Sequence, residues 1–222
     1  CCMERIYMLM VKKALIYVTG LLFMAFGVAF SVNSSLGVSP VNSLPYVISK
    51  IIHMDLGNCV ILVFSCYILV QILVMRRDFK WINLTQLIFS MIFGYFVDLA
   101  KWIVGDFAIP TYAGQLLMLA ISILLVAIGV SLYMGVKLVN MPMEGMTHAI
   151  SEKILKKLPF HDVKVIMDCL SVGIGIVLSF VFLGKLEGIR EGTVICALLV
   201  GKIMKPLKKV IDPMIQKFCF QK

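Results

Sequence analysis

The amino-acid sequence predicts an all-α, polytopic membrane helix bundle, and three observations carry that prediction. Of the 222 residues, 61% are hydrophobic and only 15% are charged, whereas an average soluble domain has about 45–50% apolar and about 25% charged residues. The mean hydropathy is +1.00. Long apolar runs recur along the whole chain, and a membrane-spanning helix needs about 20 mostly apolar residues. This composition argues against a soluble enzyme, a disordered protein and a nucleic-acid module, although the net charge is +9.

The apolar runs predict six membrane spans. They cover about residues 15–32, 56–75, 84–104, 111–134, 163–183 and 192–204. The last run is short and contains Lys202, so the distribution of charge has to decide whether it crosses. With six spans, most lysines and arginines lie on the side of the N-terminus, whereas with five spans they divide almost evenly. Because positive charge concentrates in cytoplasmic loops, we predict six spans with both chain ends in the cytoplasm.

The two halves of the sequence resemble each other. The stretch that begins at Gly27 matches the stretch that begins at Gly129 at a constant shift of 102 residues, which aligns Pro40 with Pro142. Each half holds an odd number of spans, so the second half must enter the membrane from the opposite side. This inverted-topology repeat is typical of many secondary transporters. Chance similarity between apolar segments is the alternative, and channels and scaffolds can also be pseudo-symmetric.

These matches predict a single membrane domain, 1–222, built from two repeats. Repeat 1 covers about residues 12–104 and repeat 2 about residues 111–210. Residues 205–222 are expected to form a cytoplasmic tail on the lipid surface, with Pro206 and Pro213 limiting its helicity.

Faces of small residues occur in the third and sixth spans, which match at a shift of 107 residues. Each face carries two small residues one turn apart, a spacing that lets helix backbones approach closely. The pairs are Ser90/Gly94 and Ala197/Gly201.

Each half also contains a short segment that starts at a proline. Ser39 suits an N-cap and Pro40 a first helical position, which predicts a helix to about His53. Pro142 starts a second helix, to about Leu158. At ~20–25 Å these helices are too short to be spans. Either they are re-entrant, with both N-termini near the bilayer middle, or they lie flat at the interface.

The re-entrant arrangement predicts a polar cavity lined by Ser39, Asn42, Asn140 and Glu144. Free N–H groups at two helix N-termini favour an anionic or strongly polar solute. In the interfacial alternative, Glu144 simply stabilises the dipole of its own helix.

Asp98 and Asp168 are the ionisable residues best placed inside predicted spans. A charge at the bilayer centre costs about 2.5–3.5 kcal/mol on insertion scales, so such groups usually face a cavity or a partner. We therefore add both to the predicted solute-binding residues. The alternatives are that Asp98 pairs with Lys101 and that Asp168 reaches water near its end of the helix. Asp168 shares its helix face with three small residues, Ser171, Gly175 and Ser179.

The sequence contains no cluster with metal-ligand spacing, no phosphate-binding loop and no nucleophile elbow. We therefore expect no enzymatic activity, no metal and no cofactor.

Four motifs carry a resemblance to a known family. They are GVAFSVNSSLGVSPVNSLPYVIS from Gly27, the pair Arg76-Arg77, NLTQLIFSMIFGYFVDL from Asn83 and GTVICALLVGKIMKPL from Gly192. In these motifs the chain resembles the YitT/YczE-type bacterial membrane proteins. The resemblance implies a multi-pass protein of the bacterial cell (inner) membrane with five or six spans. It implies no functional residue.

We interpret the sequence as a secondary-transporter-like protein that moves a small polar or anionic solute between its two repeats. Two alternatives remain open: a substrate-capture subunit energised by an ATPase, and a membrane scaffold with no transport activity. The expected partners are the lipid bilayer and a small-molecule solute, with no nucleic acid. A second copy of the chain or a partner subunit is left open.

Overall fold

The computed structural model describes residues 2–79, 81–158 and 160–220. All regular elements in these ranges are helical, which confirms the all-α prediction. They are α1 (Cys2–Asn33), α2 (Pro40–Ile52), α3 (Leu56–Met75), the short η1 (Arg76–Asp78) and η2 (Trp81–Leu84), α4 (Thr85–Val104), α5 (Tyr112–Val136), α6 (Pro142–Lys153), α7 (Phe160–Leu178), η3 (Ser179–Leu183) and α8 (Glu191–Phe220).

Within the described residues, five helices are long and apolar enough to cross a membrane. These are α1, α3, α4, α5 and α7, the last together with η3. The predicted sixth span lies in α8, whose apolar stretch is interrupted by Lys202 and further lysines. The protein is therefore a multi-pass membrane protein.

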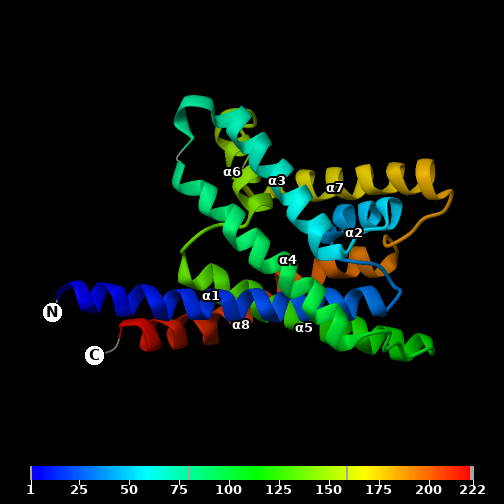
Figure 1. Ribbon diagram of the computed structural model, residues 1–222, viewed down its shortest axis with the longest axis horizontal. Coiled ribbons are helices and arrows are strands. Elements are labelled where there is room, and N and C mark those ends of the chain that lie inside the picture. The colour runs from blue at the N-terminus through cyan, green and yellow to red at the C-terminus, as the bar shows by residue number, and fades with distance from the viewer. Residues whose placement is uncertain (1, 80, 159, 221–222) are drawn as a thin grey trace.

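Three long helices, α1, α5 and α8, run side by side along the longest axis of the molecule (Figure 1). The α3–α4 hairpin packs on α1 through α4. Helix α6 packs on α3, and helix α7 packs on α2. Both chain ends lie at the same end of the molecule (Figure 1). Trp81 and Trp102 flank α4 at its two ends and are both largely exposed, as expected of aromatic residues at membrane interfaces.

The centre of the bundle is a close crossing of α1 and α5. A Cβ atom on Gly20 would lie 2.8 Å from the carbonyl oxygen of Gly129, and a Cβ atom on Gly129 would lie 2.5 Å from the carbonyl oxygen of Gly20. About two turns along each helix, the Ser122 hydroxyl donates a hydrogen bond of 2.6 Å to the Gly27 carbonyl oxygen. Helices in a membrane gain little from the hydrophobic effect when they associate, so close packing of their backbones at small residues stabilises the contact.

The two proline-started helices form as predicted at their N-termini. Ser39 is the N-cap of α2, Pro40 and Pro142 occupy the first turns of α2 and α6, and both prolines are buried. Helix α2 ends at Ile52, one residue before the predicted end. Helix α6 ends at Lys153, short of the predicted Leu158, because the amides of Ile154 and Leu155 both bond to the Ile150 carbonyl oxygen and close the helix.

The expectation that prolines limit the helicity of the C-terminal segment is wrong. Helix α8 continues through Pro206 and Pro213 to Phe220. Its residue Ile215 is 6% exposed and packs with Val136 at the end of α5. A proline inside a helix costs about 3 kcal/mol, and packing of this apolar face against α1 and α5 offsets that cost.

The two predicted small-residue faces behave differently. At Gly94 the backbone of α4 approaches α3 so closely that a Cβ atom would lie 2.7 Å from the Gly57 carbonyl oxygen. At Gly201 a Cβ atom would meet nothing within 4 Å. The close approach expected at Ala197/Gly201 is therefore wrong, because this face of α8 borders a cavity.

The Gly20–Gly129 contact yields a first prediction. We expect Gly129→Ala to lower the free energy of unfolding by about 1–3 kcal/mol, the usual cost of overpacking, because the new methyl group meets the α1 backbone. Gly173→Ala in α7 is the matched control, since a Cβ atom there meets nothing within 4 Å. Thermal unfolding in detergent measures both, and equal stability of the two variants would contradict the close crossing.

Candidate functional site

A cavity of about 370 Å³ lies where α2 and α6 begin. Five of the six predicted solute-binding residues line it, although they come from separate parts of the chain. They are Ser39, Asn42, Asn140, Glu144 and Asp168. Apolar side chains of α1, α3, α4, α5 and α8 complete the wall. The sixth predicted residue, Asp98, does not line this cavity.

Asn42 and Glu144 occupy equivalent places, each the third residue of a helix that begins with proline. Asn42 is 4% exposed, and its side-chain amide donates to the Ser39 hydroxyl at 3.1 Å. Its carbonyl oxygen Oδ1 is buried and accepts no hydrogen bond from the described residues. The start of α2 therefore presents one free acceptor to the cavity.

Glu144 is held by a tyrosine that the sequence analysis missed. The hydroxyl of Tyr133, a residue only 2% exposed, donates to Glu144 Oε1 at 2.5 Å. Tyr17 packs edge-on against Tyr133 with ring centroids 5.7 Å apart, and its hydroxyl lies 3.9 Å from the Met141 sulfur. Glu144 Oε2 is buried and accepts no hydrogen bond from the described residues.

The cavity thus contains two buried acceptor atoms, one at each helix start, that receive no hydrogen bond from the part of the chain that the structure describes. Leaving such a group unsatisfied costs about 1–3 kcal/mol, and buried polar groups are normally paired with protein or water. The acid in the first turn of α6 also suits the helix dipole. This arrangement can bind a small molecule that carries N–H or O–H donors.

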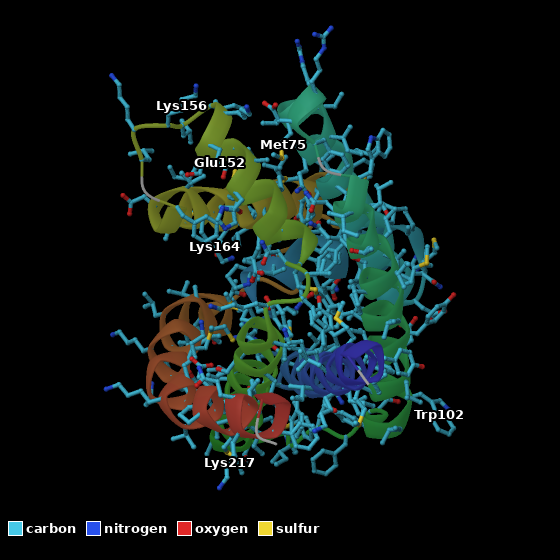
Figure 2. The ribbon with its side chains drawn as sticks, turned by 90° about the vertical axis from the view of Figure 1, so that its left-hand side faces the viewer. Met75, Trp102, Glu152, Lys156, Lys164 and Lys217 are labelled. Carbon is cyan, nitrogen blue, oxygen red and sulfur yellow. The ribbon has the colours of Figure 1, made fainter. Side chains whose placement is uncertain are left out.

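Asp168 forms an ion pair on the wall of this cavity. Lys164, one turn earlier on α7, lies 3.2 Å from its carboxylate oxygens, and about a quarter of each side chain is exposed. Figure 2 shows Lys164 on the side of α7 that faces α8. The helix face that Asp168 shares with Ser171 and Ser179 is buried, so it points into the protein.

Asp98 has a structural partner elsewhere. Its Oδ1 accepts a hydrogen bond of 2.6 Å from the Gly57 backbone N–H, in the first turn of α3. This contact satisfies one of the amides that a helix N-terminus leaves free. The predicted alternative partner was Lys101, one turn further along the same helix.

A second cavity, of about 680 Å³, adjoins the first. Both cavities are bordered by Tyr133, Met134, Asn140 and His148. The second cavity also reaches Gln71 and Gln86, two residues that the sequence analysis did not name as binding residues. Polar residues inside spans usually face the protein interior, so their position within apolar runs was the available signal. Tyr133 lies near the end of the apolar run at residues 111–134, where tyrosine is common at a membrane interface, so its position gave no such signal.

Among the described residues, no group of three or more His, Cys, Asp or Glu side chains could hold a metal ion.

The contact between Tyr133 and Glu144 yields a second prediction. We expect Tyr133→Phe to lower the free energy of unfolding by about 1–3 kcal/mol, because neither carboxylate oxygen of Glu144 then has a donor among the described residues. Tyr112→Phe, at a position 59% exposed, should leave stability unchanged. Thermal unfolding of the two variants measures this difference, and an unaltered Tyr133→Phe protein would refute the role of the hydroxyl.

Comparisons with known proteins identify a family and two relatives of this chain. Residues 11–209 match the family of unknown function DUF6198. The chain is 24% identical over 190 residues to the uncharacterized membrane protein YczE of Bacillus subtilis (strain 168), covering 85% of this chain and 82% of the relative. It is also 24% identical over 201 residues to the uncharacterized protein YyaS of the same organism, covering 90% and 94%. No solved structure matches the chain significantly. These matches confirm the resemblance to the YczE-type proteins.

Proposed function

Since the chain belongs to DUF6198, a family of unknown function, we propose a function from its cavity: secondary transport of a small polar solute across the bacterial inner membrane. The observation that carries the proposal is the meeting of Ser39, Asn42, Asn140, Glu144 and Asp168 at two buried helix starts. Irregular backbone inside a membrane protein is tolerated where it lines a cavity or is buried. Solute sites of secondary transporters use such interrupted helices.

The chemistry of the cavity narrows the solute class. Helix N-termini favour negative charge, but Glu144 already supplies that charge at the start of α6. The free atoms, Asn42 Oδ1 and Glu144 Oε2, are both acceptors. A solute with hydrogen-bond donors can bond to both atoms, whereas the negative charge of the Glu144 carboxylate repels an anion. We therefore favour a neutral or positively charged polar solute over an anionic one.

We also propose six crossings, with α8 as the sixth. The two termini lie at the same end of the molecule, and both α1 and α8 run its length (Figure 1). Figure 2 views the molecule from that end, and the side chains of Lys156 and Lys217 lie at the periphery of this view. An even number of crossings returns the chain to the side on which it began. Lysine-rich ends on one side favour the cytoplasm for both termini.

The helix contacts support an inverted repeat. In this repeat, α1 corresponds to α5, α2 to α6, α3 to α7 and α4 to α8. The contact between α1 and α4 therefore corresponds to the contact between α5 and α8, and the contact between α2 and α7 corresponds to the contact between α6 and α3. The central crossing has the same relation: Gly20 meets Gly129, while Gly27 meets Ser122. Adding the repeat shift of 102 residues to Gly20 and Gly27 gives Ser122 and Gly129. A two-fold axis in the membrane plane, through the α1–α5 crossing, produces this pattern.

The two adjoining cavities support this proposal over the scaffold alternative. A scaffold predicts a solid core between the halves. The ATPase-dependent alternative is distinguished by experiment, because the proposal requires transport by the purified protein alone.

The test begins with thermal stabilisation of the purified protein by a panel of small amines, amino acids and polyols. A ligand that binds only the folded protein stabilises it by RT ln(1 + [L]/Kd). We expect uptake of a stabilising compound into vesicles reconstituted with this chain. Asn42→Ala and Glu144→Gln should each reduce uptake at least about tenfold, which corresponds to the loss of roughly 1.4 kcal/mol of binding.

Asn58→Ala and Asp106→Asn are the matched controls, because both residues are exposed and lie outside the two cavities. They should transport normally. Unchanged uptake in both cavity variants would overturn the proposed site, and uptake that appears only when an ATPase is added would favour the capture-subunit alternative.

A further inference from the structure

The second cavity contains two buried glutamines that the proposed transport site does not use. Gln71 of α3 and Gln86 of α4 are each 3% exposed, and both line the 680 Å³ cavity. The Oε1 atom of each is buried and accepts no hydrogen bond from the described residues. Two unsatisfied carboxamide oxygens in the interior of one membrane protein require a compensating donor.

Both side chains converge on one point beside α6. A Cβ atom on Gly145 would lie 2.9 Å from Gln71 Oε1, and 3.0 Å from both Oε1 and Nε2 of Gln86. The two amide groups are therefore close enough to contact one small group together. Glycine at this position leaves that point unoccupied by a side chain, and a larger residue would fill it.

The cavity walls define the charge of a molecule that fits there. Lys137, Lys208 and Glu152 lie on its lining together with His148. Lys137 and Lys208 disfavour a cation, Glu152 disfavours an anion, and the two glutamines are uncharged. Met75 and Glu152, at the ends of α3 and α6, both line this cavity (Figure 2).

We propose that Gln71, Gln86 and the face of α6 at Gly145 form a second small-molecule site. Its ligand is an uncharged polar molecule with neighbouring O–H or N–H donors, such as a polyol or a carboxamide. The donors bond to the two free Oε1 atoms, and the glutamine NH₂ groups can return hydrogen bonds to the ligand oxygens. The shared border at Tyr133, Asn140 and His148 connects this site to the first cavity.

The experiment measures thermal shifts of the purified full-length chain with glycerol, erythritol, xylitol and acetamide. Millimolar concentrations are used, well below those at which excluded osmolytes stabilise proteins in general. We expect at least one of these probes to raise the unfolding temperature of the unmodified chain. Gln71→Leu, Gln86→Leu and Gly145→Ala should each abolish that shift, the first two by removing an acceptor and the third by filling the contact point.

Two controls keep the result specific. Gln115→Leu changes a glutamine outside both cavities and should retain the shift. Asn42→Ala alters the first cavity only and should also retain it, so failure of this site and failure of the proposed transport site give different results. In the absence of probe, both leucine variants should unfold at the same or a higher temperature, because a buried unpaired acceptor is removed.

No shift with any probe would overturn the proposal. A shift that persists in Gln71→Leu and Gln86→Leu would do the same, and its loss in Asn42→Ala would assign the probe to the first cavity. If one leucine variant fails to fold, the other variant and Gly145→Ala decide the outcome.

Discussion

The structure depends on a constraint that the bilayer places on backbone hydrogen bonding. A helix N-terminus leaves amide groups without partners, and hydrocarbon offers no water to satisfy them. Helices α2 and α6 both begin in buried positions, so protein has to cover those starts. Pro40 and Pro142 reduce the problem because proline lacks an N–H group at the position where it would be unpaired. The same constraint explains why polar side chains gather there.

The α1–α5 crossing brings these two helix starts together. At Gly20 and Gly129 the two backbones meet without intervening side chains. Helix α1 leads into the start of α2, and helix α5 leads into the start of α6. A tight crossing of α1 and α5 therefore holds both polar segments near one axis. Tyr133 of α5 belongs to this region, since it packs on Tyr17 of α1 and bonds to Glu144 of α6.

The halves differ in one respect that bears on the proposed mechanism. Helix α3 packs along α4, whereas α7 and α8 make no comparable contact over the described residues. The first cavity is bordered by both α7 and α8, including Lys164 and Gly201. Under the transport proposal, equivalent halves in different conformations open one route at a time. Exchange of the two conformations would close the α7–α8 side and open the α3–α4 side.

The sequence predicted most of this arrangement where local rules apply. Apolar runs located α3, α4 and α5 closely, and the pattern Ser39-Pro40 located the start of α2. Contacts between distant segments were harder to predict. The bond from Gly57 to Asp98 joins two helices, and the extension of α8 through Pro213 depends on packing against α5. Gln71 and Gln86 became a candidate pair only when the fold placed both beside Gly145.

The central claim is that one cavity opens alternately to the two sides of the membrane. Ser39→Cys places a thiol in that cavity, in a chain whose seven native cysteines are replaced by alanine. A membrane-impermeant thiol reagent is then applied to vesicles of each orientation. The account predicts labelling from both sides, each slowed by the transported solute. Labelling from only one side, or from neither, would contradict it.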